Sequence, residues 1–336
     1  MAGKVFITGA AGFIGFQLAK RMLSDGWDVM GFDGMTPYYS PKLKEARLSN
    51  LQSHAGFSFE KGMIEEEGRL TELVATFQPD IIIHLAAQAG VRHSIDAPRS
   101  YVVSNLIGTH EVLEAARAHP PKHLMMASTS SAYGANTEMP YSEQHRAVHP
   151  MSFYAATKVA NEAMAHSYAH LFDMPMTMFR FFTVYGPWGR PDMALFKFTS
   201  AILKGEPIDV YNHGDMQRDF TFVDDLVEGI VRLTAQAPGS DAVGQMDSLS
   251  PVAPFRVVNI GNGAPVQLSA FIEAIEAATG RTAERNLMPM QSGDVRATWA
   301  DASLLEALVG PLPRTDIKDG VRQFVEWYRG WNGSAE

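Results

Sequence analysis

The chain has 336 residues, 46% of them hydrophobic and 19% charged, a composition typical of a globular protein with a sizeable core. Its 28 basic and 37 acidic side chains give a net charge of −9, which argues against a general nucleic-acid-binding surface. The absence of cysteine excludes disulfides and thiolate metal sites, and the histidines show no metal-ligand spacing. No segment approaches the roughly 20 apolar residues of a membrane span and no signal peptide is visible, so we expect a cytoplasmic protein without membrane contact.

The first 185 residues alternate strand-like apolar runs with segments of helical length. Strands are expected at 4–8, 27–33, 57–62, 80–86, 123–129 and 176–182. Because these runs are nearly all apolar and are separated by helices, they predict a parallel sheet covered on both faces. We therefore expect an α/β fold of the doubly wound, Rossmann type, with ligands bound beyond the carboxyl ends of the strands.

After about residue 186 the alternation becomes irregular, which predicts a smaller second lobe. The first domain is expected to comprise 1–185, with 220–235 and 256–262 returning to it as a helix and a strand. The second lobe would then comprise 186–219 and 263–336, so that the two are interleaved in sequence. Residues 236–254, rich in Ala, Gly, Ser and Pro, are expected to form a surface loop.

The segment GAAGFIG follows the first strand and opens the first helix. Its glycines, Gly9, Gly12 and Gly15, permit a tight turn, a close approach of the backbone to a pyrophosphate, and close packing of the helix on the strand. The second strand ends in Asp33, whose carboxylate can accept hydrogen bonds from a ribose 2′-hydroxyl and would repel a 2′-phosphate. A glycine-rich turn alone is a weak signal, but with the strand and the acid it predicts a site for NAD rather than NADP.

Tyr154 and Lys158 lie four residues apart in SFYAATK, and therefore on one face of an expected helix. An ammonium group beside a phenol lowers the phenol pKa from about 10 towards neutral pH. Thr129 ends the fifth expected strand, so its hydroxyl should face the same crevice. The three groups could take a proton from an alcohol while hydride leaves the same carbon. A half-buried aromatic residue beside a solvated cation is the alternative that these residues alone leave open.

Together with LAAQAGVR (85–92), these motifs resemble the extended short-chain dehydrogenase/reductases that act on nucleotide sugars. Finer matches resemble the UDP-glucuronate 4-epimerase branch: PYYSPKLKEARL (37–48), AGVRHS (89–94), RFFTVYGPWGRPDMALFKF (180–198), GDMQRDFTFVDD (214–225) and PMQSGDVRATWAD (289–301). The resemblance covers nearly the whole chain. It implies NAD as cofactor, a UDP-sugar as substrate bound by the second lobe, and a homodimer paired through helices at about 99–118 and 152–172.

Carried over residue by residue, the resemblance implies Tyr154 as general base, Lys158 as its electrostatic and ribose-binding partner, and Thr129 as the hydroxyl that bonds the reacting sugar oxygen. The implied cofactor-binding residues are Gly9, Gly12, Phe13, Ile14, Gly15, Asp33, Ile64, Leu85, Ala86, Ala87, Gln88, Tyr154 and Lys158. The implied substrate-binding residues are Arg92, Ser130 beside the sugar, Thr183 and Arg190 on its far side, and Arg218 and Asp294 at the diphosphate and uridine ribose. Met63 departs from the pattern, because relatives carry an Asp there that bonds the adenine.

The two residues that directly follow Thr129 indicate which reaction follows oxidation at C4 of the sugar. Related dehydratases carry an Asp-Glu pair directly after the catalytic threonine, and UDP-glucuronate decarboxylases carry a Glu two residues after it. This chain has Ser130 and Ser131 there. We therefore expect the 4-keto sugar to be reduced again, as in a UDP-glucuronate 4-epimerase. A 4-epimerase of UDP-glucose or UDP-N-acetylglucosamine and a non-catalytic NAD-binding sensor or scaffold are the open alternatives.

Overall fold

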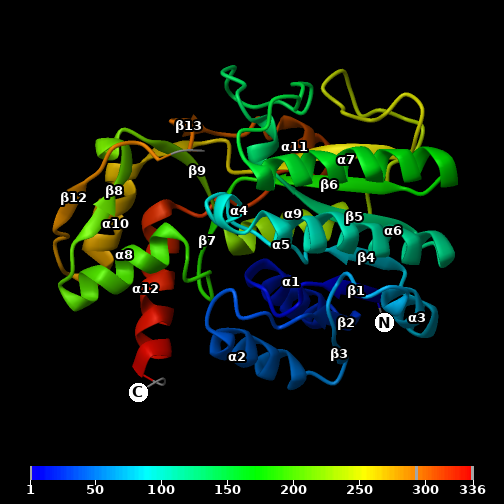
Figure 1. The fold of residues 1–336 in the computed structure, drawn as a ribbon, viewed down its shortest axis with the longest axis horizontal. Helices are drawn as coiled ribbons and strands as arrows, with labels where there is room; N and C mark the ends of the chain where they lie inside the picture. The colour runs from blue at the N-terminus through cyan, green and yellow to red at the C-terminus, as the bar shows by residue number, and fades with distance from the viewer. Residues whose placement is uncertain (1, 292–293, 334–336) are drawn as a thin grey trace.

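A seven-stranded parallel sheet forms the centre of the computed structural model, which describes residues 2–291 and 294–333 (Figure 1). Its strands are β1 (Lys4–Thr8), β2 (Asp28–Asp33), β3 (Phe57–Lys61), β4 (Ile81–His84), β5 (His123–Thr129), β6 (Met176–Phe181) and β10 (Phe255–Ile260). Their order is β10-β6-β5-β4-β1-β2-β3, and every neighbouring pair is parallel. The prediction of a doubly wound parallel sheet is confirmed. The strand order reverses between β1 and β4.

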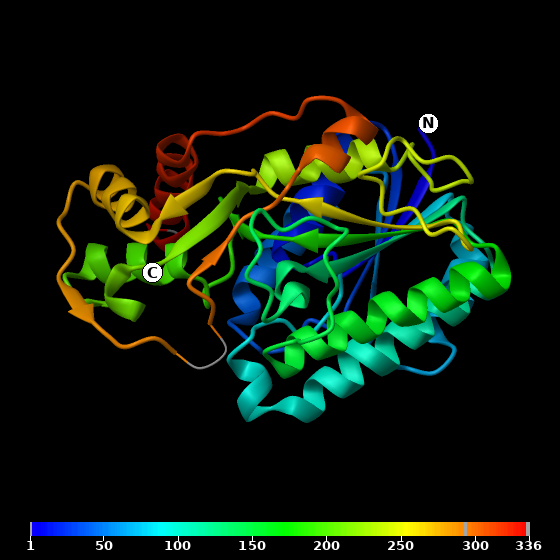
Figure 2. The same cartoon turned by 90° about the horizontal axis from the view of Figure 1, so that it is seen from above.

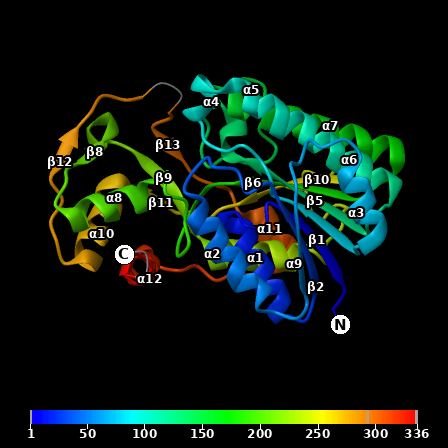
Figure 3. The same cartoon turned by 60° about the horizontal axis from the view of Figure 1, so that its bottom comes forward.

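Helices cover both faces of this sheet (Figure 2, Figure 3), which is why its strands are almost wholly apolar. One face carries α3 (Arg69–Phe77), α6 (Gly108–Ala118) and α7 (Phe153–Phe172), and the other carries α1 (Phe13–Ser24), α2 (Pro41–Gln52), α9 (Val223–Leu233) and α11 (Ser303–Val309). Alternate side chains of β1 enter two separate cores. Val5 and Ile7 pack with α1 and α9, whereas Phe6 packs with α3 and α6.

The helix expected at 99–118 is present in an altered form. Short helices α4 (His93–Asp96) and α5 (Pro98–Tyr101) lead into a π-helical segment at Val102–Ile107, and α6 follows from Gly108. A side chain at Gly108 would collide with Ile64, so the close approach requires glycine. The wider π-helical turn rotates Asn105 towards the interior, where it is buried.

The smaller lobe lies beside the carboxyl edge of the sheet and has its own aromatic core (Figure 2). Its strands are β7 (Thr183–Tyr185), β8 (Ile208–Val210), β9 (Gln217–Phe222), β11 (Pro265–Gln267), β12 (Arg285–Leu287) and β13 (Ala297–Thr298), and its helices are α8 (Ala194–Lys204), α10 (Leu268–Thr279) and α12 (Ile317–Gly333). Phe220 of β9 stacks on Phe271 of α10 with ring centroids 4.1 Å apart. Its elements alternate along the chain with α9, β10 and α11, so the two lobes are interleaved in sequence.

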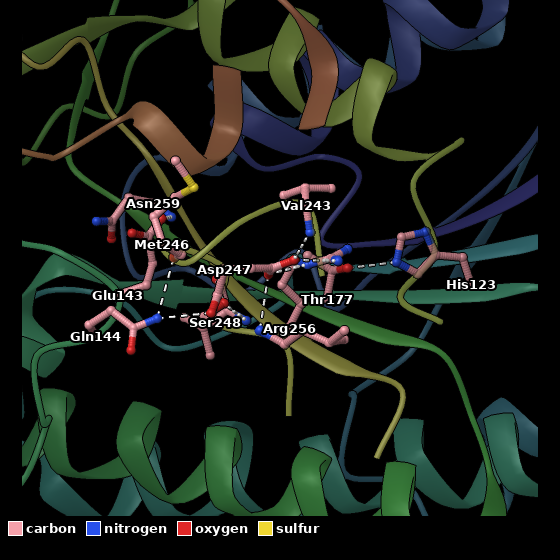
Figure 4. A network of polar contacts seen from close by, with 12 residues as sticks. His123, Glu143, Gln144, Thr177, Val243, Met246, Asp247, Ser248, Arg256 and Asn259 are labelled. Carbon is pink, nitrogen blue, oxygen red and sulfur yellow. Dashed lines mark hydrogen bonds and ion pairs between the residues drawn. The ribbon is translucent and has the colours of Figure 1, made fainter. Parts of the chain in front are cut away.

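The segment between α9 and β10 is irregular and largely exposed, yet a buried ion pair anchors it (Figure 4). Arg256 of β10 donates through Nε and Nη2 to the carboxylate of Asp247, at 2.8 and 2.9 Å. The Ser248 hydroxyl accepts the backbone N–H of Val257 at 3.0 Å. The loop therefore covers the free edge of β10, which would otherwise expose unpaired backbone groups.

Residues 292–293, which belong to the motif at 289–301, lie outside the described residues. So do residue 1 of the first expected domain and residues 334–336 of the second. Within the described part of the chain, no helix is both long and apolar enough to cross a membrane.

Candidate active site

A crevice opens at the carboxyl ends of β1, β2, β4 and β5, where the strand order reverses. The residues singled out in the sequence that line it are Gly9, Gly12, Phe13, Ile14, Gly15, Asp33, Ile64, Leu85, Ala86, Ala87, Gln88, Thr129, Tyr154, Lys158 and Arg190. The structure thus brings the glycine-rich turn and the tyrosine–lysine pair to one continuous surface, although more than 130 residues separate them in the sequence.

The glycine-rich turn requires glycine at two positions for steric reasons. Gly9 has φ +74°, and a Cβ there would lie 2.7 Å from the backbone nitrogen of Ala86. A Cβ on Gly15 would collide with the carbonyl oxygen of Gly9. Helix α1 begins directly after Gly12, so its first N–H groups have no partner within the helix. These groups and the positive end of the helix dipole suit a pyrophosphate.

Asp33 ends β2 beside this turn and is 7% exposed. Its carboxylate accepts the backbone N–H groups of Ala11 at 3.1 Å and Met35 at 2.8 Å. The Lys44 ammonium lies 3.8 Å from the same carboxylate. Asp33 is therefore fixed in place at the mouth of the turn and faces the crevice, where an acceptor for ribose hydroxyls would be needed.

Arg47 of α2 is fully buried and was missed by the sequence analysis. Its guanidinium donates to the carbonyl oxygens of Ala11 at 3.0 Å and Trp188 at 2.6 Å, and to the Tyr39 hydroxyl at 2.7 Å. Burial lowers the pKa of this guanidinium. Arg47 thereby ties the glycine-rich turn to the chain entering the smaller lobe. Its helical spacing from the apolar Leu43 was the signal that could have placed it on a buried face.

Asn105 was also missed, because a π-helical turn leaves no clear pattern in a sequence. Its Oδ1 accepts the N–H of Gln88 at 2.8 Å, and its Nδ2 donates to the Gln88 carbonyl at 3.1 Å. Nδ2 also donates to the Thr157 hydroxyl of α7 at 3.0 Å. Asn105 therefore holds the crevice segment after β4 against the helix that carries the tyrosine and lysine.

The candidate catalytic groups converge from β5 and α7. Thr129 is the last residue of β5, and Tyr154 lies in the first turn of α7, which Ser152 caps by accepting the N–H of Ala155 at 3.1 Å. Lys158 follows one turn later, 2% exposed, and its Nζ donates to the carbonyl of Ala127 at 2.8 Å. In the described ranges no group of His, Asp and Glu side chains is arranged to hold a metal ion.

The role of Lys158 in making Tyr154 acidic stays a prediction, because other groups dominate the phenol in this structure. Burial dominates and raises the pKa of the Tyr154 phenol, while the Arg190 guanidinium and a hydrogen bond with Thr129 act in the opposite direction. Burial also lowers the pKa of Lys158 to about 8. The lysine points to a backbone carbonyl, so the cation that acts on the phenol here is Arg190.

Arg190 reaches the crevice from the segment between β7 and α8. Its Nε donates to Asp192 at 3.0 Å, and the Tyr38 hydroxyl donates to the same carboxylate at 3.2 Å. Although burial opposes the charge, the pairing with Asp192 raises the pKa of Arg190. Thr183, expected on the same side of a sugar, lines a small adjoining hollow that also includes Arg190.

The remaining expected substrate residues lie outside the crevice lining. Arg92, after β4, pairs with Asp294 at 3.0 Å. Arg218 of β9 donates to the carbonyl oxygens of Gln217 at 2.8 Å and Arg296 at 3.2 Å. Ser130 opens a short 3₁₀ turn directly after Thr129. The structure therefore groups Arg218, Arg92 and Asp294, and none of the three lines the crevice that holds Tyr154.

Asp219, next to Arg218, is a further residue that the sequence analysis missed. It is fully buried, and its carboxylate accepts the N–H groups of Asn262 at 2.8 Å, Gly263 at 2.9 Å and Ala300 at 3.0 Å. One side chain thus joins three segments of the lobe around the strand that carries Arg218.

Comparisons with known proteins agree with this geometry. Residues 5–245 match the NAD dependent epimerase/dehydratase family. The chain belongs to this family. Within it, a probable UDP-glucuronate 4-epimerase of Rhizobium meliloti (strain 1021) is 55% identical over 329 residues, which cover 97% of this chain and 96% of that one. The resemblance on which the sequence analysis relied is confirmed.

Solved structures related to the epimerase/dehydratase family share the fold along nearly the whole chain. The UDP-glucuronic acid 4-epimerase of Bacillus cereus, in complex with UDP-glucuronic acid and NAD, matches with a TM-score of 0.88 at 30% identity, covering 98% of this chain and 99% of that one. A UDP-glucose 4-epimerase of Thermotoga maritima with UDP-glucose matches with a TM-score of 0.84 at 26% identity, covering 98% and 99%.

Proposed function

We propose that this protein is an NAD-dependent UDP-glucuronate 4-epimerase, which inverts C4 of the sugar through a transient 4-keto form to give UDP-galacturonate. The observation that carries the proposal is the grouping of Thr129, Tyr154 and Lys158 at one end of a dinucleotide-type crevice, with Ser130 and Ser131 where related dehydratases and decarboxylases carry carboxylates. The similarity to proteins named as UDP-glucuronate 4-epimerases over nearly the full chain supports the same substrate.

Along its whole length the crevice offers polar groups that suit the parts of NAD. The N–H groups at the start of α1 suit the pyrophosphate, Asp33 suits the adenosine ribose, and Lys158 suits the ribose beside the reacting ring. When bound there, NAD accepts a hydride from C4 and later returns it. Ile64 and Leu85–Gln88 line the walls between these polar groups.

In the proposed first step, the Tyr154 phenolate removes the proton of the sugar 4-hydroxyl, directly or through the Thr129 hydroxyl. Burial opposes the phenolate, so the step depends on positive charge near the phenol. Arg190 supplies such charge in the structure. The Lys158 ammonium adds to it if it turns from the Ala127 carbonyl towards the crevice.

In the second step, the 4-keto sugar turns about its link to the diphosphate and presents its other face. Arg218, with Arg92 and Asp294, is proposed to hold the diphosphate and the uridine ribose while the sugar turns. A 4-keto glucuronate is a β-keto acid and loses CO₂ readily, so its carboxylate must be held with the breaking bond out of conjugation with the ketone. Ser130, Thr183 and Arg190 are the proposed holders. The Nε and Nη2 of Arg190 donate to Asp192, so its contribution to holding the sugar carboxylate is its positive charge.

A 4-epimerase of UDP-glucose or UDP-N-acetylglucosamine is the second candidate. The match to a UDP-glucose 4-epimerase of the same fold supports it, because the catalytic groups would be shared. The substrates of the two candidates differ in whether the sugar carries a carboxylate. The proposed contact of Arg190 with that carboxylate therefore distinguishes them. A sensor or scaffold without activity would have no need for Thr129, Tyr154 and Lys158 in one crevice.

We further propose a cytoplasmic homodimer. Apolar side chains that remain exposed on the π-helical segment and α7 support a helix-to-helix interface, namely Val102, Ile107, Phe153, Leu171 and Phe172. We propose 1–185 with 220–235 and 256–262 as the NAD-binding domain, and 186–219 with 263–336 as the nucleotide-sugar-binding lobe. At the borders of these ranges, α11 packs on the main sheet, and β7 and the end of β9 belong to the sheet of the smaller lobe.

Proton NMR of the purified protein with UDP-glucuronate, with and without added NAD, tests the proposed function. Conversion to UDP-galacturonate without a pentose product is the expected result. Formation of UDP-xylose or its 4-keto precursor would contradict the roles given to Ser130 and Ser131. If only UDP-glucose or UDP-N-acetylglucosamine were turned over, the assigned substrate would change, whereas the proposed proton transfer would stand.

A further inference from the structure

A buried carboxylate lies one helical turn beyond Lys158 on the same face of α7. Glu162 is 9% exposed, and its carboxylate accepts three hydrogen bonds. Arg180 of β6 donates through Nε at 2.9 Å and Nη2 at 2.7 Å, and the Ser128 hydroxyl of β5 donates at 2.5 Å. Glu162 thereby connects the helix that carries Tyr154 and Lys158 to two strands of the sheet.

Glu162 is hydrogen-bonded to one buried cation, Arg180, and lies one helical turn from a second, Lys158. Arg180 is 4% exposed and Lys158 is 2% exposed. In the register of β5 and β6, Arg180 is the partner of Ser128, the residue after the carbonyl that Lys158 bonds. Burial penalises the positive charge of both side chains. The carboxylate of Glu162 is the group that offsets this penalty, since it acts to raise the pKa of Lys158 and that of Arg180.

We propose that Glu162 is a positioning residue, whose charge keeps Lys158 in its ammonium form and whose contacts with Ser128 and Arg180 hold that lysine at the end of β5. This inference rests on the role proposed for Lys158 in the epimerase. The direction agrees with the electrostatics, since burial lowers the pKa of Lys158 to about 8 and Glu162 opposes that fall.

The other titratable groups near Lys158 do not replace this charge. His84 of β4 is buried between the hydroxyls of Thr8 and Thr109, and burial, with the charge of Lys158, lowers the pKa of His84 to about 3. It is therefore neutral above pH 5. Tyr154 lies one turn before Lys158, and burial raises the pKa of its phenol, which carries negative charge only as the phenolate of the proposed first step. Arg190 is a cation.

On the far side of the carboxylate, the Tyr133 ring lies 4.5 Å from the Arg180 guanidinium. Burial raises the pKa of Tyr133, so this phenol also stays neutral. Among the described residues around Lys158, Glu162 is thus the carboxylate that sets its charge.

The test is a direct titration of Lys158 by NMR. Full-length protein is saturated with NAD and labelled with ¹³C at the lysine ε-carbons. It is titrated from about pH 6 to 10.5, so that the range ends near the usual lysine pKa of about 10.4. The resonance missing from Lys158→Met identifies Lys158. In Glu162→Gln its midpoint should fall by about 1 pH unit, the smaller end of the effect of a close opposite charge. The alkaline limb of kcat should move down by a similar amount.

Two further variants separate charge from geometry. Glu228→Gln is the matched control, because Glu228 is also paired with two arginines, Arg21 and Arg232, but on α9. It should leave the Lys158 midpoint unchanged. Ser128→Ala removes a hydrogen bond but no charge, so it should also keep the midpoint of the wild type. A fall in Ser128→Ala as large as in Glu162→Gln would overturn the proposal.

The proposal would likewise be overturned if Glu162→Gln folds, as checked by circular dichroism, and its Lys158 titration midpoint equals that of the wild type. If that variant does not fold, Glu162→Asp decides the question. Its carboxylate is withdrawn by one methylene, so the midpoint should fall by less than in Glu162→Gln, and an unchanged midpoint would contradict the proposal. Since the titration does not depend on turnover, its result is separate from the fate of the epimerase assignment.

Discussion

The two halves of the proposed active site are built by different means. The dinucleotide half uses backbone groups of the glycine-rich turn and buried side chains, such as Asp33 and Arg47, that hydrogen bonds hold in place. The sugar-diphosphate half uses Arg92 and Asp294, which are 47% and 22% exposed in their side chains and come from segments 202 residues apart. An exposed ion pair is worth about 0–1 kcal/mol, so a phosphate can replace one partner at little cost. The first half is thus preorganised, whereas the second can rearrange around its ligand.

The largest effect on activity is expected from Tyr154, between the dinucleotide half and the sugar-diphosphate half. Tyr154→Phe should lower kcat by about 10²- to 10⁴-fold, because a general base is lost, while NAD stays bound. Turnover of UDP-glucuronate and the NAD content of the purified variant are the measurements. Tyr168→Phe, on the same helix but paired with Glu114, is the matched control and should be near normal. Loss of NAD together with activity would place Tyr154 in the dinucleotide half instead.

The second prediction concerns the sugar-diphosphate half alone. Arg218→Met should raise KM for the UDP-sugar by roughly 30-fold, since hydrogen bonds to a charged group contribute about 2 kcal/mol. NAD affinity should not change. Arg296→Met removes an exposed cation directly before β13, paired with Asp215, and serves as the control. An unchanged KM with weakened NAD binding would reverse the assignment of Arg218.

The third prediction concerns the buried polar groups of the main sheet in acid. Burial lowers the pKa of His84 to about 3 and that of His123 to about 4, so the unfolded chain binds more protons below pH 6.5. Each histidine should cost up to about 1.4 kcal/mol of unfolding free energy per pH unit as the pH falls from 6.5 towards 4. Burial raises the pKa of Glu143 to about 7, so this residue adds stability as the pH falls from 7 to 4.5.

Urea unfolding at a series of pH values from 7 to 4.5 measures the net slope. His123→Asn should make the loss of stability in acid shallower, and Glu143→Gln should make it steeper. Equal slopes in the wild type and both variants would mean that these groups titrate alike in the folded and unfolded chain.

The smallest effect is expected at the adenine end. Met63 lines the crevice where relatives carry an Asp. Its backbone N–H donates to the Glu66 carboxylate at 2.9 Å, and its carbonyl accepts the N–H of Glu66 at 3.2 Å. Met63→Asp should tighten NAD binding by roughly 5-fold, the value of about one hydrogen bond, as measured by calorimetry. Met63→Leu is the apolar control. Equal affinities in all three proteins would show that the adenine is bonded elsewhere.

The sequence alone determined the features that depend on neighbours in the chain. An apolar run, a turn of glycines and a helix start form one continuous segment, so GAAGFIG with Asp33 located the crevice before any packing was known. The four-residue spacing of Tyr154 and Lys158 likewise placed both on one helix face, because helical geometry is local.

Tertiary structure decided the features that depend on distance in space. Arg47 reaches Trp188 across 141 residues, and Asp219 accepts the N–H of Ala300 across 81. No local pattern connects these partners. The pKa of Tyr154 depends on such partners too, since burial raises it and Arg190, which comes from the smaller lobe, acts to lower it. Spacing along the chain determines which side chains share a helix or a turn, whereas desolvation and charge are summed over every neighbour that folding brings close.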